Sequence, residues 1–129
     1  MKREAFTLVE LMIVVIIIGV LVAMVAPNMI GRSEQARVSV ARADIDVNIA
    51  TAIKLYDADT GSLPKTLDDL VVSPGDENWK GPYLDKVPLD PWKKPYVYKA
   101  PGEHRPESYD LSSLGKGGVE GTDNITNWE

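Results

Sequence analysis

The chain opens with a short polar segment and then becomes almost entirely apolar. No residue from Leu11 to Ala26 is charged, and Leu, Ile, Val and Met dominate this run. A helix from Phe6 to Ala26 would be about 30 Å long, because each residue adds about 1.5 Å, and this length matches the hydrocarbon core of a bilayer. The pattern therefore predicts a membrane-spanning helix over residues 6–27.

Beyond Pro27 the pattern becomes that of an amphipathic helix. Apolar residues recur at intervals of three or four, at Val38, Ala41, Ile45, Ile49, Ala52 and Leu55. This spacing places them on one helix face that can pack on a globular head. A proline inside a helix removes a backbone hydrogen bond and clashes with the preceding turn, so the helix either stops or kinks there. Because the pattern resumes, we expect a kink near Pro27 and an amphipathic helix over 28–60, ending at Gly61.

The remaining residues, 61–129, predict a small globular head. Thr66 and Asp69 have the spacing of a helix N-terminal capping pair, so a short helix is expected from Thr66 to about Val72. The stretch from there to residue 95 is rich in Pro, Gly, Asp and Lys. We expect it to be an ordered loop because it also carries large side chains that burial would pin. These are Trp79, Tyr83, Leu84 and Trp92.

Two later segments have strand composition. Residues 96–99 and 109–112 are rich in Tyr, Val, Leu and Ser, and residues 101–106 between them would connect a hairpin. A third short strand is expected near 125–128. The predicted fold class is α+β, with one long N-terminal helix packed on a small antiparallel sheet and an ordered C-terminal loop.

Composition narrows the classes of function. The 129 residues carry a net charge of -5 and no cysteine, which argues against nucleic-acid binding, disulfide frameworks and Cys-based zinc sites. The single histidine, His104, would have to carry any triad or histidine metal site alone. Gly115-Lys116-Gly117-Gly118 lacks the Ser or Thr that follows Lys in a phosphate-binding loop. We therefore expect neither an enzyme nor a nucleotide-binding protein.

Glu10 stands out because it lies inside the membrane-compatible segment. An ionised side chain at the bilayer centre costs roughly 3 kcal/mol on insertion scales, so an acid in this place predicts a functional site with a partner. Lys2 and Arg3 precede the run, and the positive-inside tendency places the N-terminus in the cytoplasm. Ala23-Met24-Val25-Ala26 could be read as a signal-peptide cleavage site, but Glu10 interrupts the apolar region and the helical pattern continues. A plain membrane anchor would leave Glu10 unexplained.

The segment Ala5-Phe6-Thr7-Leu8-Val9-Glu10 resembles the processing site of type IV pilins and type II secretion pseudopilins. The family usually carries Gly at the position of Ala5. The resemblance implies that a membrane-embedded prepilin peptidase removes residues 1–5 by cutting between Ala5 and Phe6, and that Phe6 is then N-methylated. It also implies that Glu10 faces the N-terminal amine of a neighbouring subunit in the filament.

Several segments of the head are similar to one branch of this family, the major pseudopilins of type II secretion. They are Gly81-Pro82-Tyr83-Leu84, Leu89-Asp90-Pro91-Trp92, Pro95-Tyr96-Val97-Tyr98, Ser113-Leu114-Gly115 and Ile125-Thr126-Asn127-Trp128. The resemblance implies a structural subunit of a periplasmic pseudopilus that helps push folded exoproteins through the outer membrane. Its implied partners are further copies of itself, minor pseudopilins, an inner-membrane assembly platform, the prepilin peptidase and, before assembly, membrane lipid.

The implied location is the bacterial inner membrane, with a single span, the N-terminus in the cytoplasm and the head in the periplasm. Two alternatives stay open. The first is a major type IV pilin of a surface fibre, although such pilins often close their C-terminal region with a disulfide and this chain has no cysteine. The second is a membrane-anchored periplasmic enzyme or binding module.

The resemblance also implies a calcium ion in the loop after Ser113-Leu114-Gly115. Calcium takes about six to eight oxygen ligands, many of them carboxylates. The positions that match the family's ligands are the carbonyl groups of Leu114 and Val119 and the side chains of Asp123 and Asn124. One family aspartate is replaced by Gly117, and Glu120 could substitute from an unaligned position. The alternatives are a calcium site and an ordinary glycine-rich surface loop.

Overall fold

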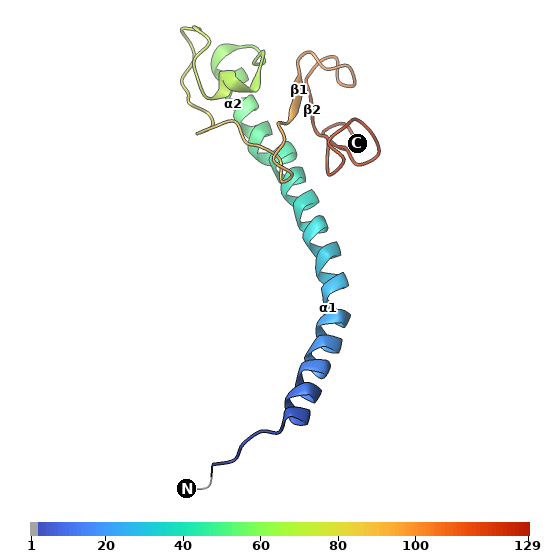
Figure 1. Ribbon diagram of the computed structural model, residues 1–129. Coiled ribbons are helices and arrows are strands. Elements are labelled where there is room, and N and C mark those ends of the chain that lie inside the picture. Colours follow the sequence, from blue (N-terminus) through green and yellow to red (C-terminus); the bar gives the residue numbers. More distant parts are fainter. Residues whose placement is uncertain (1–2) are drawn as a thin grey trace. The chain divides into compact units, whose positions relative to one another are not determined.

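A computed structural model describes residues 3–129, apart from the side chains of residues 28 and 30 (Figure 1). Lys2 and the first part of the predicted leader lie outside the described residues. The chain forms two compact units, of which the first ends at Ala36 and the second spans Arg37–Glu129. Residues 37–60 therefore belong to the same unit as the head segment 61–129.

Helix α1 (Leu8–Ala43) contains the predicted apolar run and continues through Pro27. The alternative that the helix stops at Pro27 is wrong, because a proline removes only one hydrogen bond from a ladder of 36 residues. The kink at Pro27 stays a prediction. The helix begins at Leu8 and not at Phe6, because the side chain of Thr7 accepts a hydrogen bond from a first-turn N–H group and so caps the helix.

The helical region of the second unit changes geometry before it ends. Helix α1 passes into a π-helical segment, η1 (Asp44–Asn48), which is followed by α2 (Ile49–Thr60). Gly61 closes α2 in the left-handed conformation, with φ 78° and its N–H group bonded to the Asp57 carbonyl. The predicted stop at Gly61 is thus confirmed.

The predicted core face of this region is confirmed in its middle, where Ala41, Ile45, Ile49 and Ala52 are buried, and is wrong at its two ends. Its buried residues are Ala41, Ile45, Ile49, Ala50, Ala52, Ile53 and Tyr56. Leu55 is 52% exposed and Val38 is 40% exposed, so their assignment to the core face was wrong. The wider π turn keeps residues four apart in register with the core, which brings Ile53 and Tyr56 inward in place of Leu55. Val38 lies one turn ahead of Ala41, the first core residue.

The predicted antiparallel sheet is confirmed. Strands β1 (Val97–Lys99), β2 (Asp110–Ser113) and β3 (Ile125–Thr126) pair in the order β1-β2-β3, with β2 in the middle. In the ladder, Val97 lies opposite Ser112 and Ser113 lies opposite Ile125. Every residue of β2 is buried. The strand has a partner on each side, and Leu111 belongs to the same hydrophobic core as Ile53 of α2.

Two side-chain hydrogen bonds connect the helical region to the sheet and to the residue before it. The Tyr96 hydroxyl donates to Asp44 Oδ2 at 2.7 Å, and the Arg42 guanidinium donates to the Thr126 carbonyl at 2.7 Å. Burial, and then the hydrogen bond to Asp44, raise the pKa of Tyr96 above its ordinary value. Asp44 opens the π segment, so the change in helix geometry and the attachment of the sheet occur at the same turn.

The loop ahead of the sheet is ordered, as the aromatic content predicted. The short helix η2 (Leu67–Leu70) is capped by Thr66 and Asp69 and ends two residues earlier than expected. Trp79 Nε1 then donates to the Asp69 carbonyl at 2.8 Å, and the Tyr83 hydroxyl donates to Asp59 Oδ2 at 2.8 Å. Further contacts come from side chains packed against the core, including Leu84 and Trp92.

Candidate functional site

The first candidate site is the start of α1, where Glu10 and Thr7 cap the helix reciprocally. The Thr7 N–H group donates to Glu10 Oε2 at 3.0 Å, and the Glu10 N–H group donates to Thr7 Oγ1 at 3.2 Å. This is a capping box. A Thr followed three residues later by Glu ahead of an apolar run is the sequence signature of such a box, which was not among the predictions above. Glu10 thus has a partner within its own chain.

The predicted processing site lies beside this carboxylate. Ala5, Phe6 and Glu10 line one surface hollow together with Glu4. Residues 3–7 carry no helix or strand, and Phe6 is 88% exposed. An exposed segment without regular structure is the form in which a peptide bond is open to a peptidase. The structure therefore brings together the residues that the resemblance assigns to cleavage and to assembly.

From Leu11 to Ala26 the surface of α1 is apolar over its whole circumference. All large apolar side chains from Leu8 to Val25 are about half exposed or more. The helical stretch Leu8–Thr60 is, by length and composition, long and apolar enough to cross a membrane. Soluble monomers rarely expose apolar patches larger than a few hundred Å². This surface therefore needs lipid or other protein chains to cover it.

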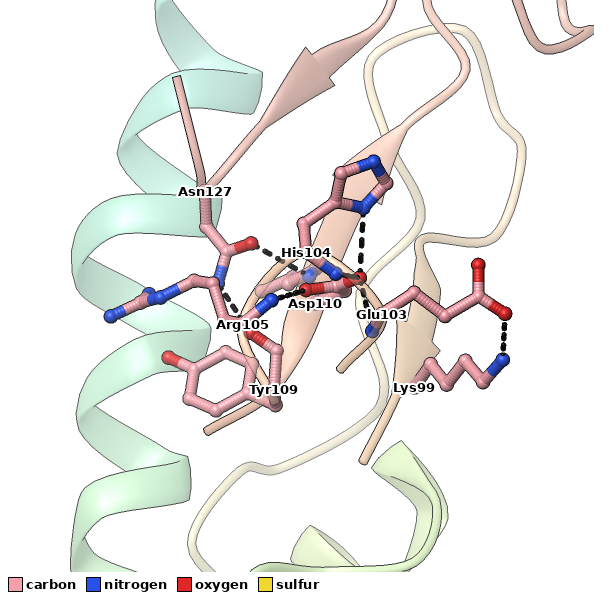
Figure 2. A network of polar contacts seen from close by, with 8 residues as sticks. Lys99, Glu103, His104, Arg105, Tyr109, Asp110 and Asn127 are labelled. Carbon is pink, nitrogen blue, oxygen red and sulfur yellow. Dashed lines mark hydrogen bonds and ion pairs between the residues drawn. The ribbon is translucent and has the colours of Figure 1, made fainter. Parts of the chain in front are cut away.

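In the head, the hairpin between β1 and β2 is held by one carboxylate, as Figure 2 shows. Asp110 is 7% exposed and accepts hydrogen bonds from the backbone N–H groups of Glu103, His104 and Arg105 at 2.9 to 3.1 Å. His104 Nδ1 lies 3.0 Å from the same carboxylate. Burial by itself would raise the pKa of Asp110, but these hydrogen bonds hold it below its ordinary value.

His104 also contacts the C-terminal segment. Its ring stacks on that of Trp128, with the ring centroids 4.1 Å apart and the planes 3° from parallel. The one histidine of the chain thus joins the hairpin to the C-terminal segment.

Asn127 extends the sheet beyond β3 with its side chain. Its Oδ1 accepts from the Leu111 N–H group at 3.0 Å, and its Nδ2 donates to the Tyr109 carbonyl at 3.1 Å (Figure 2). Its backbone N–H group donates to the Leu111 carbonyl at 3.1 Å. These bonds give Asn127 a structural role, because they attach the segment after β3 to β2 and to Tyr109.

Asp90 links the Asp-Pro-Trp segment to the end of the sheet. Its carboxylate is 3% exposed; Oδ1 accepts from the N–H groups of Trp92 and Lys94, and Oδ2 accepts from the Ser113 hydroxyl at 2.7 Å. Ser113 Oγ in turn accepts from the Gly115 N–H group at 3.1 Å. One buried carboxylate therefore connects the loop around residue 92 with the loop that follows β2.

The residues predicted to bind calcium lie in that second loop. Asn124 Oδ1 already accepts from the Gly121 N–H group at 3.2 Å, and Val119 is 70% exposed. Over the residues that the structure describes, no three His, Cys, Asp or Glu side chains gather as metal ligands would. This donor set does not fit the carboxylate-rich cage that calcium prefers, and calcium binding stays a prediction.

Comparison with known proteins identifies the family. The prokaryotic N-terminal methylation motif matches residues 1–26, and the family of type II secretion system (T2SS) protein G matches residues 28–128. The chain is 44% identical over 140 residues to the type II secretion system core protein G of Pseudomonas aeruginosa, which covers 99% of this chain and 96% of the relative. The protein of the same name from Escherichia coli K12 is 42% identical over 137 residues, which covers 98% and 92% respectively.

A solved structure agrees. The crystal structure of the major pseudopilin from the type 2 secretion system of enterohaemorrhagic Escherichia coli matches with a TM-score of 0.64 and 30% identity, over 79% of this chain and 95% of that chain. This likeness confirms the predicted fold class. The family is one of structural secretion pseudopilins and is not a known family of enzymes. The chain therefore belongs to the type II secretion system protein G family.

Proposed function

We propose that the chain is the main structural subunit of a periplasmic pseudopilus that helps push folded exoproteins through the outer membrane. The observation that carries the proposal is the helix surface from Leu11 to Val25, which is apolar on all sides and exposed, in a chain of this family. Before assembly, membrane lipid would cover this surface. In the fibre, the same helices from other copies would cover it.

Glu10 would favour the move of the helix from lipid into the fibre. A cut between Ala5 and Phe6 creates an ammonium group at Phe6, and N-methylation leaves this group positively charged. An ionised carboxylate is costly in lipid, whereas a well-aligned ion pair offsets much of the desolvation cost. A carboxylate has about four lone-pair sites, so Glu10 can keep its bond to the Thr7 N–H group and still accept a bond from the amine of a neighbour.

The topology and the partners follow from the same proposal. Arg3 and Lys2 keep the N-terminus in the cytoplasm by the positive-inside tendency, and the head folds in the periplasm. The prepilin peptidase processes the chain, an inner-membrane assembly platform adds subunits, and minor pseudopilins complete the fibre. A cytoplasmic ATPase supplies the energy.

Substitutions at Glu10 test the proposal. Glu10→Ala is expected to insert in the membrane, as judged by fractionation, and to form no fibres in negative-stain electron microscopy of overexpressed protein. Thr7→Val is the matched control, because it breaks the Thr7 half of the capping box and keeps the carboxylate. We expect this control to assemble.

The outcomes separate helix capping from subunit pairing. Normal fibres from Glu10→Ala would refute the ion pair between subunits. Loss of fibres in both variants would show that the cap, and not the pair, is what assembly needs. Fibres from Thr7→Val together with none from Glu10→Ala would support the pairing.

A further inference from the structure

The face of the sheet that points away from the core carries a cavity. Leu111 lies in the core, and successive side chains of a strand point to opposite faces, so Ser112 lies on the outer face of β2. Val97 of β1 lies opposite Ser112 in the ladder and shares this face. Both residues line a cavity of about 380 Å³, whose other walls come from the hairpin, the loop that follows β2 and the C-terminal segment.

The hydroxyl group of Ser112 is a buried polar group without a partner in the fold. Ser112 is 5% exposed, and its hydroxyl forms no hydrogen bond with any residue that the structure describes. Most buried polar side-chain atoms in proteins have at least one hydrogen-bond partner. Because Ser112 lines the cavity, its hydroxyl is available to a group that enters from outside.

The lining is negatively charged, and one of its carboxylates is unpaired. Its charged members, besides His104, are Lys99, Glu103, Asp110 and Glu120. Lys99 forms an ion pair with Glu103, and Asp110 accepts three N–H groups and faces His104 (Figure 2). Glu120 forms neither a hydrogen bond nor an ion pair with the described part of the chain. A cation that enters the cavity therefore meets a free carboxylate at Glu120.

The remaining walls suit an aliphatic stem that ends in a positive charge. Val97 and Leu114 contribute apolar surface, and Trp128 contributes an aromatic ring. The stacked ring of His104 holds the Trp128 ring in place. Aromatic rings attract cations, and the methylene groups of a lysine pack along apolar surface while its ammonium group reaches polar partners.

We propose that this cavity binds a lysine side chain presented by another protein chain. The ammonium group donates to the Glu120 carboxylate and to the Ser112 hydroxyl oxygen, and the stem lies along the apolar walls. An ammonium group is a compact charge with three donors, which suits one free carboxylate beside one hydroxyl. The planar group of arginine instead favours two parallel bonds to a carboxylate. The cavity differs from the predicted calcium site, because Val119 and Asp123 do not line it.

Proton NMR of the full chain in detergent, prepared without a histidine tag, tests the proposal. The single histidine of the chain, His104, lines the cavity, so its ring signals need no further assignment. The probe is Nα-acetyl-lysine amide, and Nα-acetyl-norleucine amide is its uncharged match. We expect a saturable shift of the His104 signals with the lysine probe and none with the norleucine probe.

Two variants test the groups that are assigned to the ammonium group. Glu120→Gln removes the charge and keeps the shape, and it is expected to weaken binding of the lysine probe about fivefold. Ser112→Ala removes the buried acceptor and is expected to weaken binding as well. Glu107→Gln changes an exposed acid of the hairpin that does not line the cavity. It is the matched control and is expected to leave the affinity unchanged.

Saturable binding of the lysine probe that Glu120→Gln weakens and Glu107→Gln does not would support the proposal. Equal shifts from the norleucine probe, or an affinity that Glu120→Gln leaves unchanged, would overturn it. The same shift from calcium at equal ionic strength would overturn it too, because the cavity would then be a metal site. Binding of butylammonium without binding of the lysine probe would assign the cavity to a free amine and would also overturn it. No fibre is needed for these measurements, so their outcome is independent of the proposed function.

Discussion

Asp110→Ala tests how much one carboxylate contributes to the head. The substitution removes the acceptor that the N–H groups of Glu103, His104 and Arg105 share. A hydrogen bond to a charged group contributes about 1.5 to 3 kcal/mol, and contributions within one network do not add fully. Water can reach part of the exposed hairpin loop, so we expect a loss of about 3 kcal/mol in the free energy of unfolding, and not the full sum.

The assay is thermal unfolding of the full chain in detergent, followed by tryptophan fluorescence. For a unit of this size, the expected loss corresponds to a fall of about 15 °C in melting temperature. Asp85→Ala is the control, because Asp85 is exposed, and it is expected to change stability by no more than about 0.5 kcal/mol. An Asp110→Ala variant that melts within the range of the Asp85 control would refute the role given to the network.

The pH dependence gives a second check. Because the folded state holds the pKa of Asp110 below its ordinary value of 3.8, the folded chain binds fewer protons than the unfolded chain. The contribution of Asp110 is therefore complete above 3.8 and is lost as the pH falls through the lowered pKa. The difference in melting temperature between the unchanged chain and Asp110→Ala should shrink in that acid range. A difference that grows on acidification would contradict the argument.

Two further substitutions probe the edge of the sheet and the end of α2. Asn127→Ala leaves the Leu111 N–H group and the Tyr109 carbonyl without their side-chain partner. It is expected to lower the free energy of unfolding, measured by chemical denaturation, by about 2 kcal/mol. A loss of under about 0.5 kcal/mol would show that water replaces the side chain. Gly61→Ala places a Cβ at a φ of 78° with no neighbour within 4 Å, so strain alone should cost about 1 kcal/mol, measured by thermal unfolding. Gly121→Ala has no such φ and is the control; equal losses in the two variants would rule out backbone strain as the cause.

The sequence predicted the elements whose signals are local. The apolar run, the cap at Thr66, the stop at Gly61 and the strand segments each depend on neighbouring residues, and the structure confirms them. The capping box at Thr7 and Glu10 has a local signal too, and it gives the Glu10 carboxylate a partner within its own chain. The buried stripe was predicted correctly at four of its six positions, and it failed at Leu55 because the periodicity assumes a uniform helix and η1 changes the number of residues per turn.

Only the tertiary structure shows which polar residues of the head contact each other. Asp90 and Ser113 are joined only because the loop around residue 92 folds against the end of β2. Sequence alone marks such residues as ordinary polar surface residues, since it does not show which distant segment faces them.

The sequence by itself therefore determined the membrane-compatible helix and the order of elements in the head, because hydrophobic periodicity and capping act over a few residues. The tertiary structure alone decided which carboxylates are buried and what they bind. A charge is stable in the interior only where donors from several segments converge on it, and that convergence is a property of the folded chain.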